Sequence, residues 1–249
     1  MTKIYISPSD QTNNAYAGTS TNEAVQCRKI GKELEKALDR CGFNSKCNTT
    51  SGMYDRIAES NNGKYDLHLC IHTNAFNKKT TGTRIFVYKK SGEAYEVAKE
   101  IFKVLAPLTP GTSESISVNQ TWAEIIKTNA PCVYIEVDFH DVSGVAKWIV
   151  EHTSDIAEEI AKGICNHYGV KYKPPTTNTA PVKKKTFNVK VNTDVLNVRT
   201  GAGADNKKVG TVEKGEAYTI VETKSKDGVE WGLLKFGIGW ISLKYTVKI

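Results

Sequence analysis

One stretch decides the fold of the first part of the chain, and it reads Asp66-Leu67-His68-Leu69-Cys70-Ile71-His72-Thr73-Asn74-Ala75. If this stretch were a helix, His68 and His72 would share one face at i and i+4, the spacing of a helical zinc-protease motif. That motif needs a Glu directly after the first His, where this chain has Leu69. The short apolar run and its closing Thr-Asn pair instead favour a buried β-strand.

A strand separates the two histidines too far for one metal ion. Four residues span about 13 Å in a strand, because each residue rises about 3.3 Å. A metal that lies about 2.0–2.1 Å from a ring nitrogen cannot then bind both. We therefore assign His72, at the strand end, to a functional site, and we expect His68 to be a packed histidine.

The pattern around this strand predicts an α/β fold. Further strands are predicted over residues 3–7, 43–47, 83–88 and 132–138, and helices over 21–41, 52–60, 93–105, 143–151 and 154–168. Such alternation is typical of a mostly parallel sheet flanked by helices. Ligands of these sheets bind at the carboxyl ends of the strands. Three segments should meet there: 8–13, 72–74 and 136–138.

Three side chains at that edge are candidates for hydrolytic chemistry. Glu136 follows the apolar run 132–135, and a carboxyl group at such a strand end has a raised pKa suited to a general acid or base. Asp138 would share its face about 6.6 Å away, if the segment stays extended. Glu23 lies at a predicted helix start, where the helix dipole alone also favours a Glu.

The rest of the chain divides into a linker and a small basic unit. Residues 173–185 are rich in proline and lysine, which is typical of an extended linker, so we predict domains at 1–172 and 186–249. Residues 1–181 hold 21 Lys and Arg against 20 Asp and Glu, whereas residues 182–249 hold 13 against 7. This positive charge predicts an anionic polymer as partner, with a solvated lysine-rich linker as the alternative. No base-reading motif supports nucleic acid.

Cysteine usage and the N-terminus bear on the compartment. The six cysteines form no C-x-x-C pair, and several lie in apolar contexts, so we predict reduced, buried thiols. The N-terminus lacks the apolar core of a signal peptide, and no apolar run approaches about 18 residues. We therefore expect synthesis in the cytoplasm and no membrane partner. The oligomeric state is left open.

The first unit resembles the zinc-dependent N-acetylmuramoyl-L-alanine amidases of the amidase-3 family. The matching pieces are an early strand with a loop and Glu23, then the segments 71–75, 82–88 and 133–139. The resemblance implies hydrolysis of the amide bond between N-acetylmuramic acid and L-alanine in peptidoglycan. It implies that Glu23 and His72 bind zinc, and that Glu136 is the catalytic acid or base.

One position departs from the family pattern. The family usually has a His after the first strand, whereas this chain reads Ser7-Pro8-Ser9-Asp10-Gln11. Alignment on the proline places Asp10 at the histidine position, and Gln11 is the neighbouring candidate. A carboxylate is the commoner zinc ligand, so both residues stay open as the third ligand.

The second unit resembles a bacterial SH3 domain. The carrying motifs are Leu-Asn-Val-Arg-Thr-Gly at 196–201 and Gly-Trp-Ile at 239–241, within short strands separated by glycine turns. The resemblance implies a small all-β barrel that binds the cell wall. Trp231, Trp240 and Tyr245 could line a groove, although we expect at least one tryptophan in the barrel core.

Together the two resemblances predict a modular bacteriolytic amidase. Without a secretion signal, an endolysin released by lysis is the expected setting, and an autolysin exported by another route is the alternative. A wall endopeptidase or deacetylase could use the same metal site. A catalytically dead wall-binding protein is the third hypothesis, because the family histidine is missing.

Overall fold

We describe a computed structural model of the chain over residues 1–175, 186–235 and 239–249. Its internal contacts divide it into two compact units, Met1–Thr176 and Thr177–Ile249. Each unit is described by itself below. Most of the linker predicted over residues 173–185 lies outside the described residues.

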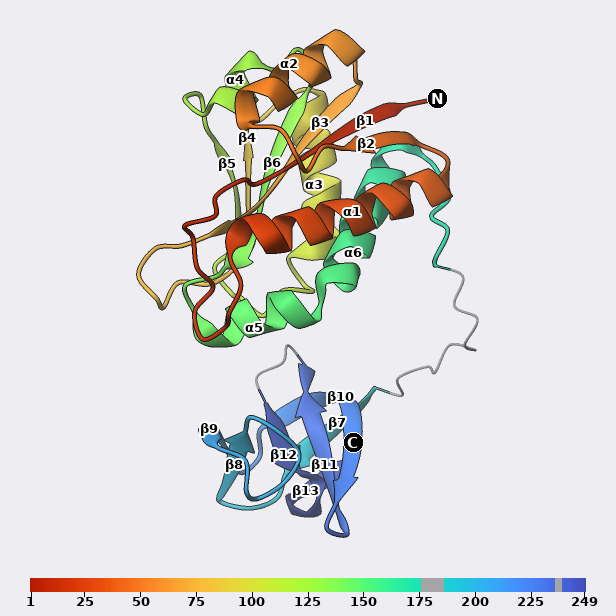
Figure 1. The fold of residues 1–249 in the computed structure, drawn as a ribbon. Coiled ribbons are helices and arrows are strands. Elements are labelled where there is room, and N and C mark those ends of the chain that lie inside the picture. The colour runs from red at the N-terminus through yellow and green to blue at the C-terminus, as the bar shows by residue number, and fades with distance from the viewer. Residues whose placement is uncertain (176–185, 236–238) are drawn as a thin grey trace. The chain divides into compact units, whose positions relative to one another are not determined.

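The first unit is built on a mixed sheet in which most neighbouring strands are parallel (Figure 1). Its strands are β1 (Lys3–Pro8), β2 (Asn44–Cys47), β3 (Leu67–Asn74), β4 (Arg84–Val87), β5 (Ser115–Val118) and β6 (Cys132–Phe139). Their order is β2-β1-β3-β6-β4-β5, and only the β4–β6 pair is antiparallel. The predicted α/β class is confirmed. The antiparallel pairing brings the start of β4 to the end of β6.

Helices cover both faces of this sheet. They are α1 (Glu23–Cys41), α2 (Met53–Gly63), α3 (Glu93–Leu105), α4 (Ala123–Lys127), α5 (Ser143–Glu151) and α6 (Thr153–Tyr168). Helix α1 begins where the Asn22 side chain accepts a hydrogen bond from the Val25 amide, at 3.0 Å. It ends at Cys41, and the capping residue Gly42 has a φ of 97°, which suits a residue without a Cβ. Of the strands and helices in this unit, only β5 and α4, which are four and five residues long, were not predicted from the sequence.

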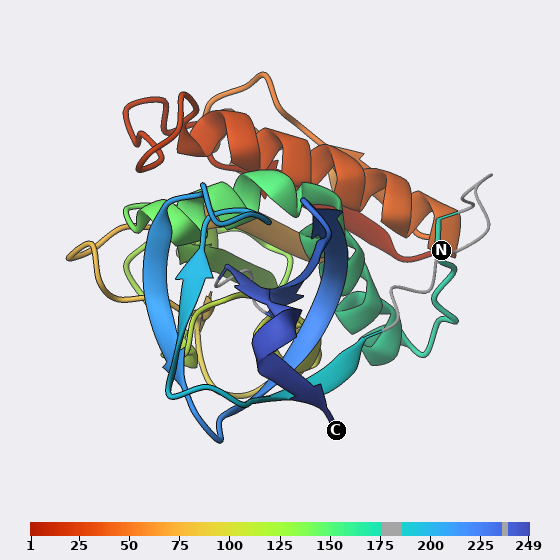
Figure 2. The same ribbon diagram turned by 90° about the horizontal axis from the view of Figure 1, so that it is seen from below.

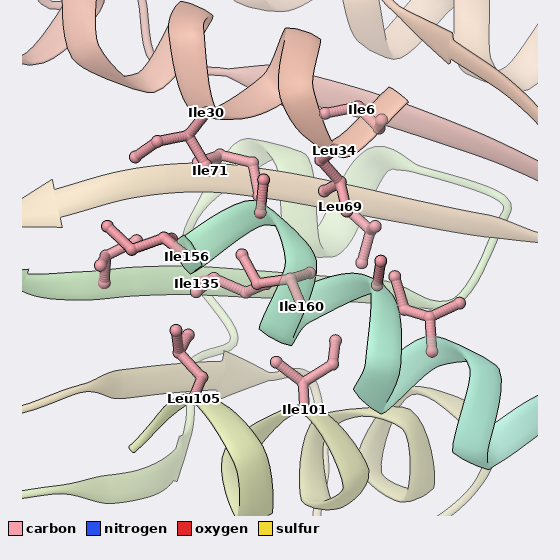
Figure 3. Packing of buried hydrophobic residues seen from close by; sticks show 14 of the residues in the cluster. Ile6, Ile30, Leu34, Leu69, Ile71, Ile101, Leu105, Ile135, Ile156 and Ile160 are labelled. Atoms are coloured by element: carbon pink, nitrogen blue, oxygen red, sulfur yellow. The ribbon is translucent and has the colours of Figure 1, made fainter. Parts of the chain in front are cut away.

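Alternation along β3 separates an apolar face from a polar one. Leu67, Leu69 and Ile71 enter the main core, where side chains of α1, α3 and α6 meet the sheet (Figure 3). His68 and His72 point to the opposite face, because successive strand residues alternate sides. Helices α2 and α4 lie on that side. His68 and His72 therefore stand on the face away from the main core.

The second unit is all-β. Its strands are β7 (Phe187–Val191), β8 (Val195–Arg199), β9 (Lys208–Glu213), β10 (Ala217–Lys226), β11 (Val229–Leu234), β12 (Trp240–Ser242) and β13 (Thr246–Lys248), with a 3-10 turn η2 at Leu243–Tyr245. They form one sheet in the order β13-β7-β10-β11-β12-β8-β9, which curves around a common interior (Figure 2). Ile220, Leu234 and Ile241 are fully buried in its core. The predicted small all-β unit is confirmed.

None of the helices in the described ranges combines the length and the apolar character that a membrane span requires.

Candidate functional site

Glu23 and His72 form a buried pair where α1 begins and β3 ends. The His72 Nδ1 lies 2.9 Å from the Glu23 Oε1. Burial opposes the charge of His72, but the hydrogen bond to Glu23 and the nearby carboxylates Glu136 and Glu124 outweigh it and raise the pKa of His72. Burial likewise acts against the charge of Glu23, and its hydrogen bonds with His72 and Asn14 leave the pKa of Glu23 below its usual value.

Glu136 stands opposite His72 on the neighbouring strand. The two residues are register partners in the parallel β3–β6 pair. Burial raises the pKa of Glu136 to about 8, with His72 acting to lower it and Glu23 to raise it. Its Oε2 atom is buried and has no hydrogen-bond partner among the described residues. A carboxyl group with these properties can hold or accept a proton near neutral pH.

The loop between β1 and α1 separates Gln11 from Asp10. The Asn14 Nδ2 donates to the Gln11 Oε1 at 2.8 Å and to the Glu23 Oε2 at 2.6 Å. Gln11 therefore shares a hydrogen-bond donor with Glu23. The Asp10 carboxylate instead lies 3.3 Å from the Arg56 Nη1, and the Arg56 guanidinium is buried. The structure thus brings Gln11 to the Glu23–His72 pair and directs Asp10 to Arg56.

Glu124 is a buried acidic residue that the sequence analysis missed. It lies on α4, and its Oε1 accepts a hydrogen bond from the Ser7 hydroxyl and lies 3.3 Å from the His68 Nε2. Its Oε2 lies 4.0 Å from the His72 Nε2. Burial acts to raise the pKa of Glu124, but His68, Ser7 and His72 outweigh it, so the pKa is lowered. The sequence does place Glu124 between Trp122 and two isoleucines, and this apolar context could have indicated that it is buried.

His68 is fully buried, as predicted, and it lies beside two thiols. Its Nδ1 lies 3.0 Å from the Ser60 hydroxyl. The Cys70 and Cys132 sulfurs are 3.7 Å apart, and the ligand atoms of the three residues lie within 4.8 Å of one another, close enough for a metal ion. All six cysteines are buried, which confirms the predicted burial of the thiols, and their reduced state stays a prediction. Burial raises the pKa of Cys70 well above its usual value and so favours a neutral thiol.

Asp138 binds loop backbone rather than the Glu23–His72 pair. Its carboxylate accepts hydrogen bonds from the amides of Gly82, at 2.7 Å, and Gly111, at 3.1 Å. Nearby, the His140 Nδ1 and the Tyr16 hydroxyl each lie 2.9 Å from the Thr73 hydroxyl. Asp138 therefore supports the rim beyond the strand ends.

These observations define an α/β protein with a histidine and carboxylate site at the carboxyl ends of its parallel strands. A family model described as N-acetylmuramoyl-L-alanine amidase matches residues 8–166, and a bacterial SH3 domain model matches residues 194–247. The chain belongs to the N-acetylmuramoyl-L-alanine amidase family. The resemblances found in both parts of the sequence are confirmed.

Two curated relatives are uncharacterized proteins of Clostridium perfringens. One is 23% identical over 212 residues, which cover 80% of this chain and 63% of the relative. The other, described as a 38.4 kDa protein, is 28% identical over 154 residues, which cover 58% of this chain and 45% of the relative. The chain therefore spans less than two thirds of either relative's length.

Solved structures share the fold of the first unit. The catalytic domain of CwlV, an N-acetylmuramoyl-L-alanine amidase from Paenibacillus polymyxa var. colistinus, matches with a TM-score of 0.62 and 19% identity, over 69% of this chain and 100% of that domain. The catalytic domain of the CD27L endolysin, which targets Clostridia difficile, matches with a TM-score of 0.57 and 20% identity, over 67% of this chain and 98% of that domain.

The second unit carries a cavity of about 510 Å³. Its lining combines Trp231 and Tyr245 with the cationic side chains Arg199 and Lys244. Trp231 and Trp240 are buried, and Tyr245 is 45% exposed. Aromatic rings beside cations suit a ligand that is partly apolar and partly anionic.

Proposed function

We propose that the protein is a zinc-dependent amidase that cleaves the bond between N-acetylmuramic acid and L-alanine in peptidoglycan. One observation carries the proposal: the buried Glu23–His72 pair lies beside a buried carboxyl oxygen of Glu136 that has no hydrogen-bond partner among the described residues. Burying such groups costs free energy, so they are retained where they bind or react. Family membership supports the same reaction.

The donor set fits a zinc ion. Two atoms that each lie about 2.0–2.1 Å from a tetrahedral ion are roughly 3.3 Å apart. The His72 Nδ1 and the Glu23 Oε1 are 2.9 Å apart, close to that separation. We propose that these atoms bind the zinc ion with the Gln11 amide oxygen, which shares the Asn14 donor with Glu23. The Arg56 contact of Asp10 argues against Asp10 as that third ligand.

Glu136 is the proposed acid and base of the reaction. A zinc ion held by these residues would supply Lewis-acid chemistry: it would lower the pKa of the attacking water and polarise the scissile carbonyl. The Glu136 carboxylate takes a proton from that water and later donates it to the leaving amine nitrogen. Burial raises the pKa of Glu136, and this favours the protonated form that donates in the second step.

The second unit is proposed to bind the wall. Its match to the bacterial SH3 domain and the excess of Lys and Arg in residues 182–249 support this role. Peptidoglycan is then both the substrate of the first unit and the anchor of the second. We propose that the protein acts at the cell wall after release by lysis, in the manner of an endolysin.

Product analysis of digested peptidoglycan tests the proposal. An amidase releases new N-terminal L-alanine without new reducing sugar ends, and a zinc chelator stops the release. New amino termini at other residues would indicate an endopeptidase, and released acetate a deacetylase. Wall binding without any new termini would show a dead hydrolase.

A further inference from the structure

The two nitrogens of His72 have different surroundings. The Nδ1 lies 2.9 Å from Glu23, whereas the Nε2 is buried and has no hydrogen-bond partner among the described residues. The Glu124 Oε2 lies 4.0 Å from that Nε2, too far for a hydrogen bond. A carboxylate therefore stands at each edge of the imidazole, and only the Glu23 side is joined to it.

The tautomer of His72 decides whether its Nδ1 can bind a metal. A neutral imidazole carries its proton on one nitrogen and has a lone pair on the other. If Nδ1 binds zinc, the proton must lie on Nε2, and a buried N–H without an acceptor is costly. Ligating histidines almost always donate this second N–H to a carboxylate, a carbonyl or water.

Other contacts hold Glu124 as an acceptor. Its Oε1 receives the Ser7 hydroxyl and lies beside the His68 Nε2, which leaves the Oε2 free to face His72. Ser7 is fixed in turn, because the Arg56 Nε donates to its hydroxyl oxygen at 2.7 Å. The carboxylate thus has one oxygen tied to the sheet and the other directed at His72.

We propose that Glu124 is a positioning residue that accepts the Nε2 proton of His72 and so keeps Nδ1 available to bind the metal. The proposal rests on the zinc site proposed above. Apart from Glu124, no described residue offers an acceptor to the His72 Nε2. Glu124 would then matter to catalysis although it touches neither substrate nor metal.

The isosteric Glu124→Gln variant tests the role. If the Gln oxygen keeps the Ser7 and His68 contacts, its amide nitrogen faces the His72 Nε2 and donates to it, which forces the proton onto Nδ1. We expect zinc affinity, measured by competition with a chelator, to fall by about 10–100-fold. Glu158→Gln on α6, which breaks the pairing with Arg40, is the matched control and should leave affinity unchanged.

Nitrogen-15 NMR of the zinc-loaded parent chain gives a second readout that does not depend on a variant folding. The Nε2 proton of His72 should appear as a downfield imidazole signal that exchanges slowly with water. Rapid exchange, or a Glu124→Gln affinity within threefold of the parent, would overturn the role of Glu124. A Glu23→Gln variant that loses zinc in the same assay would show that the metal site itself stands. A parent chain that binds no zinc would overturn both proposals.

Discussion

The two units differ in where their charged side chains lie: the first unit buries several of them, whereas those of the second unit lie nearer the solvent. The first unit buries a set of ionisable side chains: Glu23, Arg56, His68, His72, Glu124, Glu136, Asp138 and His140. In the described part of the second unit, Ser242 is the only buried polar residue, and the acidic and basic side chains lie nearer the solvent. Buried charge is expensive unless it is paired. We therefore expect the buried charges of the first unit to serve binding or catalysis, and the surface charges of the second unit to serve recognition.

The largest expected effect comes from Glu136→Gln. Removing the acid and base should lower the amidase rate by about 10²–10⁴-fold, because general acid–base catalysis contributes that much. Wall binding should persist, since it belongs to the other unit. Glu230→Gln, at an exposed position in the second unit, is the matched control. The amidase rates of both variants are measured on purified peptidoglycan. Equal rates for Glu136→Gln and Glu230→Gln would contradict the assignment of catalysis to the first unit.

Matched core truncations test whether the units are stable independently. Leu34→Ala in the first unit and Leu234→Ala in the second each remove a fully buried side chain. We expect each to lower the free energy of unfolding of its own unit by about 2–5 kcal/mol. Denaturation can be followed by the tryptophans of each unit, Trp122 and Trp148 or Trp231 and Trp240. If both variants shifted one shared transition, the units would not unfold independently.

The choice between Gln11 and Asp10 gives an intermediate effect. Gln11→Ala should weaken zinc binding by roughly tenfold or more, because losing a ligand costs at least as much as losing a supporting contact. Asp10→Ala should leave zinc affinity near that of the parent, since Asp10 pairs with Arg56. Equilibrium dialysis against a zinc buffer measures both. A larger loss of zinc affinity for Asp10→Ala than for Gln11→Ala would show that Asp10 is the third ligand, as the alignment on the proline suggests.

A smaller effect is expected from Glu59, at the edge of the first unit. Its hydrogen bonds with Lys46, Tyr5 and Asn48 lower the pKa of Glu59 to about 2. A depressed carboxyl pKa stabilises the fold above the unfolded value, near 4.5, and that stability is lost as the pH falls towards 2.

Glu59→Gln should therefore lower the Tm by roughly 2–4 °C at pH 7. The difference from the parent should vanish near pH 2. Calorimetric scans across this range measure it, with Asp205→Asn in the second unit for comparison. Asp205 is exposed and pairs with Lys226 at the surface, so its replacement should change the Tm less. A Glu59→Gln effect independent of pH would contradict the account.

The sequence predicted the sheet well where local pattern decides structure. The short apolar run in 66–75 with its closing Thr-Asn pair is a local signal, and so is the helical pattern over 21–41, so β3 and α1 were predicted to within a few residues. The direction of β4 was not predicted, because it depends on the path of the whole chain. Helix α4 is only five residues long, too short to show a helical periodicity in the sequence. The position of Glu124 could therefore not be predicted.

The candidate site was predicted only in part, for a similar reason. Glu23, His72 and Glu136 lie at the ends of predictable elements, and the structure brings them together. Gln11 and Asp10 are adjacent in a loop, where spacing cannot tell one from the other. The contact that separates them comes from Arg56, which lies 46 residues from Asp10 in the chain.

The carboxylate of Asp138 couples two loops at the rim of the site. Gly82 precedes β4, and Gly111 precedes β5, yet both amides end on one carboxyl group. If one loop opens, the Asp138 carboxylate loses one of these hydrogen bonds, and its contact with the other loop becomes weaker. We therefore expect the two amides to exchange hydrogen with the same opening free energy, as a single cooperative unit.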